Sequence, residues 1–195
     1  MVAVLACLAL LATLACLGAL LWVHLLPTGY QPIRNAVSDY GVGAYRAFYQ
    51  AQTAAIAVAA LALAAAFAKQ ADPSPRRVIV LLVIFALARL AIPSFPTDLD
   101  RGQPTRTGRI HVLLAGVAFG SIAWAAAALP DQVDWPSIHG PLATLGWVVV
   151  ATAIACGLAM TRLLHAPTEP FFGLIERCFY AAMITWFAVV SIYLI

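Results

Sequence analysis

Asp98 and His111, which flank one loop, are the strongest candidates for acid–base chemistry in this sequence. Asp98 ends the stretch FPTD (95–98), and His111 ends the stretch GRIH (108–111). A carboxylate beside an imidazole orients the ring and favours its charged form, as general acid–base catalysis requires. The alternative is structural: Asp98 caps a turn, and His111 lies at the membrane–water interface.

A second group of polar side chains follows in NAVSDYGVGAYRAFYQAQT, between two apolar runs. Ser38 and Asp39 suit a binding site, but they also suit the cap of a turn or helix, and we keep both interpretations. A lipid-facing Gln is costly, so a helical face that carries one is expected to point into the protein interior. Three residues recur at the i, i+4, i+7 spacing of such a face: Tyr45, Tyr49 and Gln52.

A third group consists of charged residues within or beside apolar runs. Arg89 lies four residues before Pro93, and Glu176 and Arg177 are near the start of the last apolar run. An Arg at the membrane centre costs about 2.5–3.5 kcal/mol on insertion scales. Arg89 therefore either snorkels to the surface or pairs with Asp39, Asp98 or Glu176. A Glu near a helix start also has a simpler explanation, because it stabilises the helix dipole.

The composition indicates a membrane protein. Of the 195 residues, 64% are hydrophobic and only 10% are charged, and the mean hydropathy is +0.94. A water-soluble domain of this size cannot bury so much apolar surface. The net charge is +3, and no basic cluster is longer than Arg76-Arg77, so we expect no nucleic-acid partner.

Six apolar segments are long enough to cross a hydrocarbon core of about 30 Å as helices of about 20 residues. Backbone groups in lipid must be paired within their own segment, so we predict helices rather than irregular chain. The predicted fold is all-α: a polytopic integral membrane protein, with residues 1–195 forming a single six-transmembrane-helix bundle. The predicted spans cover about residues 2–26, 45–68, 77–95, 109–129, 140–164 and 172–194.

Small residues let membrane helices approach closely, and the fourth predicted span contains Gly116-x-x-x-Gly120. We expect this pair to form a contact within the bundle. The alternative is a contact between two copies, and a homodimer stays among the expected partners.

Six spans place both termini on one side of the membrane, together with the loops at 69–77 and 130–140. Most polar residues fall on the other side, in the loops at 27–45, 93–109 and 163–173. The positive-inside rule, applied to the raw count of Lys and Arg, makes that second side cytoplasmic. Its cations are interleaved with carboxylates, however, and charges held in a site report topology poorly.

We expect no metal and no cofactor. The polar side carries residue types that bind zinc, but no fixed spacing such as HxxxH or HExxH joins them. These residues are His24, His111, His165, Asp98 and Glu176. The four cysteines are expected to be free thiols, since no CxxC spacing occurs.

Four sequence blocks, in this order and spacing, resemble a family of six-span membrane proteins catalogued as domain of unknown function 998. They are GYQPIRNAVSDYG (29–41), FPTD (95–98), GRIH (108–111) and GLIERCF (173–179). Asp39 stands where the family more usually has Glu, and Glu176 where Gln is expected. The resemblance implies a multi-pass protein of a prokaryotic cytoplasmic (inner) membrane with both termini in the cytoplasm. It implies no established activity.

Three functions fit these residues. The polar side forms a cleft that binds a membrane lipid headgroup or small amphiphile, or it is an intramembrane, possibly metal-dependent, hydrolase or transferase that uses Asp98 and His111. In the third hypothesis, the polar groups only tie the helices together. Arg101 is a further candidate contact for phosphate. The binding candidates are Ser38, Asp39, Tyr45, Arg46, Tyr49, Gln52, Arg89, Arg109, Glu176 and Arg177.

Overall fold

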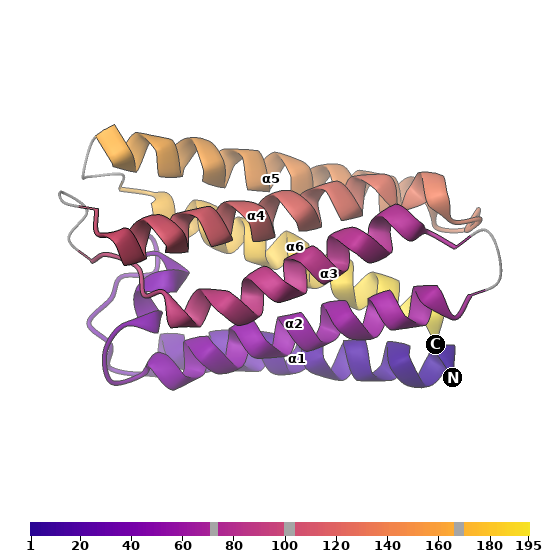
Figure 1. Ribbon diagram of the computed structural model, residues 1–195, viewed down its shortest axis with the longest axis horizontal. Coiled ribbons are helices and arrows are strands. Elements are labelled where there is room, and N and C mark those ends of the chain that lie inside the picture. The colour runs from indigo at the N-terminus through magenta and orange to yellow at the C-terminus, as the bar shows by residue number, and fades with distance from the viewer. Residues whose placement is uncertain (71–73, 100–103, 166–169) are drawn as a thin grey trace.

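The computed structural model describes residues 1–70, 74–99, 104–165 and 170–195, except for the side chains of residues 162–165. Six helices in these ranges are each long and apolar enough to cross a membrane, and the same ranges contain no strand (Figure 1). The predicted all-α fold with six spans is therefore confirmed. The helices are α1 (Val2–Leu25), α2 (Arg46–Ala68), α3 (Arg76–Ala91), α4 (Arg106–Ala128), α5 (His139–His165) and α6 (Phe172–Leu194).

The predicted and observed helix boundaries differ by more than two residues at two places, and local chemistry explains both. Helix α4 begins at Arg106 rather than at about 109, because the Thr105 side chain caps it by accepting a hydrogen bond from the Gly108 N–H, at 3.0 Å. Helix α3 ends at Ala91 and continues as a short 3-10 turn (Ile92–Ser94). That turn contains Pro93, which has no N–H to continue an α-helix.

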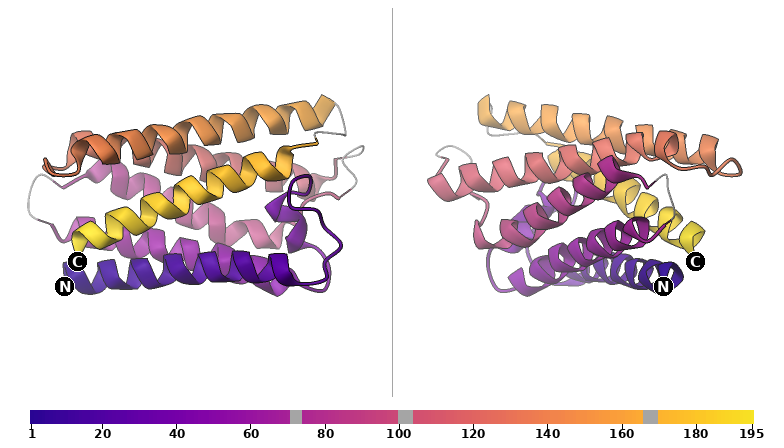
Figure 2. Two further views of the ribbon diagram at one scale, coloured as in Figure 1. Left: turned by 180° about the vertical axis from the view of Figure 1, so that it is seen from behind. Right: turned by 45° about the vertical axis from the view of Figure 1, so that its right-hand side comes forward.

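The helices form a ring in which each packs against the next along the chain, and α6 packs against α1 to close it. Figure 2 shows α6 running obliquely between α5 and α1. Both termini lie at one end of the bundle (Figure 1). We call the opposite end, where residues 26–45 and 92–99 lie, the far end.

Two helices pack closely at Gly146 and not at the glycine pair expected from the sequence. A Cβ atom added to Gly146 of α5 would lie 2.5 Å from the Ala126 carbonyl oxygen, so α4 and α5 approach closely there. Gly116 and Gly120 are exposed, and no atom of the described chain lies within 4 Å of a Cβ built on either. The expectation that Gly116-x-x-x-Gly120 forms a contact within the bundle is therefore wrong, because these glycines lie on the outer face of α4.

Candidate functional site

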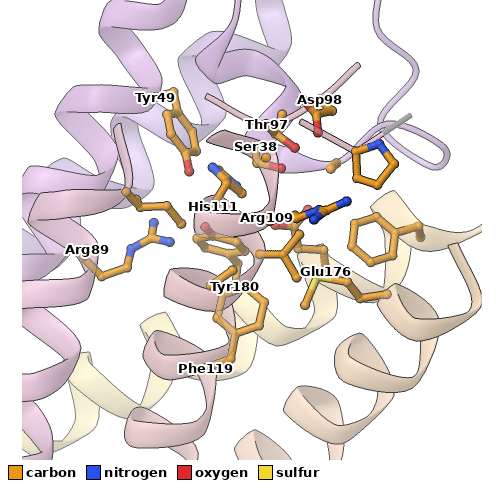
Figure 3. A pocket seen from close by; sticks show the side chains of 18 residues that line it. Ser38, Tyr49, Arg89, Thr97, Asp98, Arg109, His111, Phe119, Glu176 and Tyr180 are labelled. Atoms are coloured by element: carbon orange, nitrogen blue, oxygen red, sulfur yellow. The ribbon is translucent and has the colours of Figure 1, made fainter. Parts of the chain in front are cut away.

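A cavity of about 240 Å³ lies inside the ring at the far end, between α2, α3, α4, α5 and α6 (Figure 3). It is covered by residues next to and within a short 3-10 helix, η1 (Val37–Gly41). Because liquid water occupies about 30 Å³ per molecule, the cavity has room for roughly eight waters or one small polar headgroup. Its polar lining residues are Ser38, Tyr49, Arg89, Thr97, Asp98, Arg109, His111, Glu176 and Tyr180.

Apolar side chains complete the wall of the cavity. Phe119 of α4 is one of them, and Val112 and Ala115 of the same helix lie between it and the start of α4. Met160 of α5 and Phe172 of α6 line other parts of the wall. The cavity therefore presents polar and apolar surface together, which suits an amphiphilic molecule.

Arg89 is a charged residue within the third membrane-spanning segment, Arg76–Ser94. Its side chain is 2% exposed, so it does not snorkel. Its Nη2 donates to the Gln52 side-chain oxygen at 3.1 Å, and its guanidinium lies 5.5 Å from the centre of the Tyr180 ring. In the described chain it forms no ion pair with Asp98 or Glu176, and its buried Nε has no hydrogen-bond partner. Arg89 is therefore a buried cation that faces a cavity, which neither sequence-based explanation anticipated.

The Tyr49 and Gln52 side chains point into the interior, as the sequence predicted. Gln52 is 1% exposed and donates to the Cys16 thiol sulfur at 3.6 Å while accepting from Arg89. Tyr49 is buried and lines the cavity. Tyr45 precedes α2 and lines a different hollow instead, so the polar face begins one helical turn later than expected.

His111 is held in one orientation by a backbone carbonyl. Its Nδ1 lies 2.7 Å from the Phe95 carbonyl oxygen. A carbonyl oxygen only accepts, so Nδ1 carries the proton and a neutral ring has an unprotonated Nε2. The residue is 5% exposed and lines the cavity. His111 is thus buried rather than at the interface, and it offers the cavity a hydrogen-bond acceptor.

Asp98 is used mainly to start α4. Its two carboxylate oxygens accept from the Thr105 N–H at 2.8 Å and from the Thr105 hydroxyl at 2.7 Å. A Cβ atom on Gly108 would overlap the Asp98 carboxylate, so this position requires glycine. No hydrogen bond joins Asp98 to His111 within the described residues. The FPTD and GRIH blocks therefore meet in space, and the hydrogen bonds described there cap α4.

Glu176 lies in the second turn of α6 and reaches across to η1. It is 4% exposed, and its Oε2 accepts from the Val37 N–H at 2.6 Å. Its Oε1 forms no hydrogen bond with any residue that the structure describes. Since Glu176 lines the cavity, that oxygen is available to a ligand.

Arg177, the next residue, lies outside the cavity and holds the segment 26–45. It donates to His24 Nε2 at 2.7 Å, to the Asn35 and Gly173 carbonyl oxygens at 2.8 Å, and to the Tyr40 hydroxyl at 3.3 Å. A Cβ on Gly173 would overlap the Asn35 carbonyl, so the segment packs directly on the α6 backbone. Arg177 therefore positions the cover of the cavity and does not line it.

Three more of the predicted binding residues also lie away from the cavity. Asp39 caps η1 by accepting from the Ala36 N–H at 3.0 Å, and Arg46 is exposed at the start of α2. Tyr45 lines a hollow of about 260 Å³ that Tyr30 also lines. Partial burial raises the pKa of the Tyr30 hydroxyl, and the nearby Asp39 contributes to the rise.

Two further candidates lie outside the described part of the structure: Arg101 and the His165 side chain. Among the described residues, no three His, Cys, Asp or Glu side chains lie close enough to hold a metal ion. The described candidates that do line the cavity come from five helices and the loop before α4: Ser38, Tyr49, Arg89, Asp98, Arg109, His111 and Glu176.

Two further residues line the cavity that were not predicted from the sequence, Tyr180 and Phe119. Tyr180 follows Glu176 by four residues on α6, and this spacing places both on one helical face. The α4 residues of the wall recur at spacings of four, three and four: Gly108, Val112, Ala115 and Phe119. The helical period therefore predicts both residues, once one other residue on the same face of α4 or α6 is known to line the cavity.

A comparison with protein families matches residues 10–193 to the family described as "Protein of unknown function (DUF998)". The chain belongs to this family of membrane proteins, and the resemblance predicted from its sequence blocks is confirmed. A comparison with curated proteins and with solved structures found no match.

Proposed function

We propose that this protein binds a membrane lipid or similar amphiphile, with an anionic headgroup in the far-end cavity. The observation that carries the proposal is the buried guanidinium of Arg89, which lines the cavity and pairs with no carboxylate in the described chain. A buried charge without a counter-charge is costly, and a bound phosphate or carboxylate offsets that cost.

The remainder of the cavity supports an amphiphile over a small hydrophilic ion. Arg109 is exposed and lines the cavity as a second cation for the headgroup. Phe119 and Met160 add apolar wall, which suits the glycerol and first methylene groups of a lipid. At about 240 Å³ the cavity cannot enclose two acyl chains, so these would lie along the outer, lipid-facing surface.

An intramembrane hydrolase or transferase built on Asp98 and His111 has less support. Asp98 uses its carboxylate oxygens to cap α4, and His111 donates to Phe95. Neither residue is thereby placed to exchange a proton with the other. Binding without chemistry requires only the contacts that the cavity offers.

We also propose that both termini face the cytoplasm, so the cavity opens toward the outer leaflet. The resemblance described above supports this orientation, although the raw count of Lys and Arg favours the reverse. Arg89 and Arg177 lie toward that end of the bundle, but both are held by internal hydrogen bonds. They are part of the folded interior and report poorly on topology. Labelling from each side of the membrane tests this orientation.

The binding proposal is tested by native mass spectrometry of the protein in micelles that contain either phosphatidylethanolamine or diacylglycerol, which lacks the phosphate. We expect the phospholipid to remain bound and diacylglycerol to dissociate. Arg89→Met should weaken phospholipid binding by about tenfold or more, since a hydrogen bond to a charged group contributes about 1.5–3 kcal/mol.

Arg46→Met is the matched control, because it removes an equal charge from an exposed site at the same end. Thermal unfolding of each variant establishes that it folds. Phospholipid binding that is equal in Arg89→Met and Arg46→Met would overturn the proposal, and so would equal retention of diacylglycerol. Arg89→Lys, which keeps the charge, should retain part of the affinity and covers the case in which the Met variant fails to fold.

A further inference from the structure

The cavity is lined by two buried side chains of opposite charge. Arg89 comes from α3 and Glu176 from α6, and they are 2% and 4% exposed. No ion pair joins them in the described chain, whose hydrogen bonds take them to Gln52 and Val37 instead. Figure 3 shows them on different sides of the cavity, with His111 and Tyr180 between them.

Both side chains line the cavity, and each keeps an atom without a hydrogen-bond partner in the described chain. Arg89 Nε is buried without a partner in the described residues, and Glu176 Oε1 accepts no hydrogen bond from them. Removing an ion from water costs several kcal/mol even after the protein relaxes, and the cost is recovered only by complementary charge and hydrogen bonds. A simple anion would satisfy Arg89 and leave Glu176 unpaired. A molecule that carries both charges satisfies both residues.

We infer that the ligand is zwitterionic, with a phosphate at Arg89 and an ammonium at Glu176, as in a phosphoethanolamine headgroup. This inference rests on the proposed binding function and specifies its substrate class. The ammonium N–H groups donate to Glu176 Oε1, and a second N–H can reach the acceptor Nε2 of His111. A trimethylated ammonium has no N–H to donate, so a phosphocholine headgroup fits these acceptors less well.

The size of the cavity agrees with this class. At about 240 Å³ it accommodates a headgroup together with a few waters. A phosphoglycerol headgroup is of similar size but offers hydroxyl groups in place of the ammonium, so it leaves the charge of Glu176 unmatched. Charge rather than volume is therefore what distinguishes the ligands.

The test compares lipids that share the phosphate and differ in the rest of the headgroup, by native mass spectrometry in mixed micelles. The probes are phosphatidylethanolamine, its N-acetyl derivative, phosphatidylcholine and phosphatidylglycerol. We expect phosphatidylethanolamine to be preferred about tenfold or more over the N-acetyl derivative, which keeps the phosphate and loses the ammonium. In Glu176→Gln this preference should fall to about one, while the amide oxygen still accepts from the Val37 N–H. Glu176→Asp keeps the charge and should keep part of the preference.

The outcomes separate this inference from the function on which it rests. One outcome is that all phospholipids bind equally, that Arg89→Met weakens the binding of each to the same extent, and that Glu176→Gln has no effect. In that case the inference of a zwitterionic ligand is wrong and the proposed phosphate binding stands. If no phospholipid binds, both are wrong. Competition by water-soluble glycerophosphoethanolamine distinguishes a free headgroup from an intact lipid. The intact lipid should bind more tightly, because its chains add apolar contact.

Discussion

At the residue scale, two sequence blocks depend on one another at the start of α4. They are FPTD (95–98), in the loop before the helix, and GRIH (108–111), in its first turns. Asp98 accepts from the Thr105 backbone and hydroxyl, and Thr105 accepts in turn from the Gly108 N–H. The carboxylate lies where the side chain of any other residue at position 108 would be. Two of the wall residues, Arg109 and His111, follow directly on the same helical turns, so this cap fixes their positions.

Gly108→Ala should destabilise the protein by about 1–3 kcal/mol, as extra methyl groups do in packed sites, despite the better helix propensity of Ala. The measurement is thermal unfolding in detergent, followed by the headgroup-binding assay. Gly116→Ala is the matched control on the same helix, because no described atom lies within 4 Å of its new Cβ. It should leave stability unchanged or raise it by up to about 1 kcal/mol. An equal effect of the two substitutions would contradict the cap.

At the scale of elements, α6 secures the segment 26–45 with two adjacent residues. Glu176 binds the backbone of η1 at Val37, and Arg177 binds Asn35 together with His24 of α1. The segment is therefore held beside two neighbouring helices of the ring, α1 and α6. Tyr40 of η1 contributes a ring 5.8 Å from the Arg177 guanidinium, so the contact is both polar and aromatic.

Arg177→Lys should release this segment without unfolding the spans, because an ammonium on a flexible chain cannot reproduce four hydrogen bonds in fixed directions. Each lost bond to a charged group costs about 1.5–3 kcal/mol of local stability. Hydrogen–deuterium exchange in residues 28–45 should accelerate by about tenfold or more, with the centres of α2 and α6 unchanged. Arg46→Lys, at an exposed position, is the control and should change neither region. Uniform acceleration across all helices would contradict this role.

At the scale of the whole molecule, the buried charged side chains of the described residues gather at the far end of the bundle. They are Asp39, Arg89 and Glu176, and both termini lie at the other end. The outer faces of the spans are apolar: Leu11 of α1 and Trp147 of α5, for example, are 65% exposed. Lipid contacts such surfaces without cost. The position of the cavity along the membrane normal therefore follows from the fold, and the orientation decides which leaflet supplies the ligand.

Orientation is measured with a membrane-impermeant maleimide on intact bacterial cells that express single-cysteine additions. Gln31→Cys at the far end should be labelled from outside, and Asp134→Cys at the other end only after the membrane is permeabilised; both positions are exposed. The parent chain, which has Cys7 and Cys178 exposed on the helices, supplies the background. Labelling of Asp134→Cys in intact cells would reverse the orientation and assign the cavity to the inner leaflet.

Adjacent residues show how far the sequence could predict the site. Glu176 and Arg177 both looked like binding residues, but neighbours on a helix point about 100° apart. Glu176 therefore faces the cavity and Arg177 faces the segment 26–45. In the same way, Asp98 and His111 were correctly placed at one end of the bundle, and their separate partners, Thr105 and Phe95, emerged only from the folded chain.

The sequence by itself determined the class of protein, the six spans, the placement of both termini at one end and the family. These depend on local properties: the length and hydropathy of each segment and the order of four short blocks. Only the tertiary structure decided which polar side chains share a cavity, because that depends on the rotation of each helix and on the atoms across from it. It separated residues that shape the site, such as Asp98 and Arg177, from Arg89 and Glu176, which face its interior.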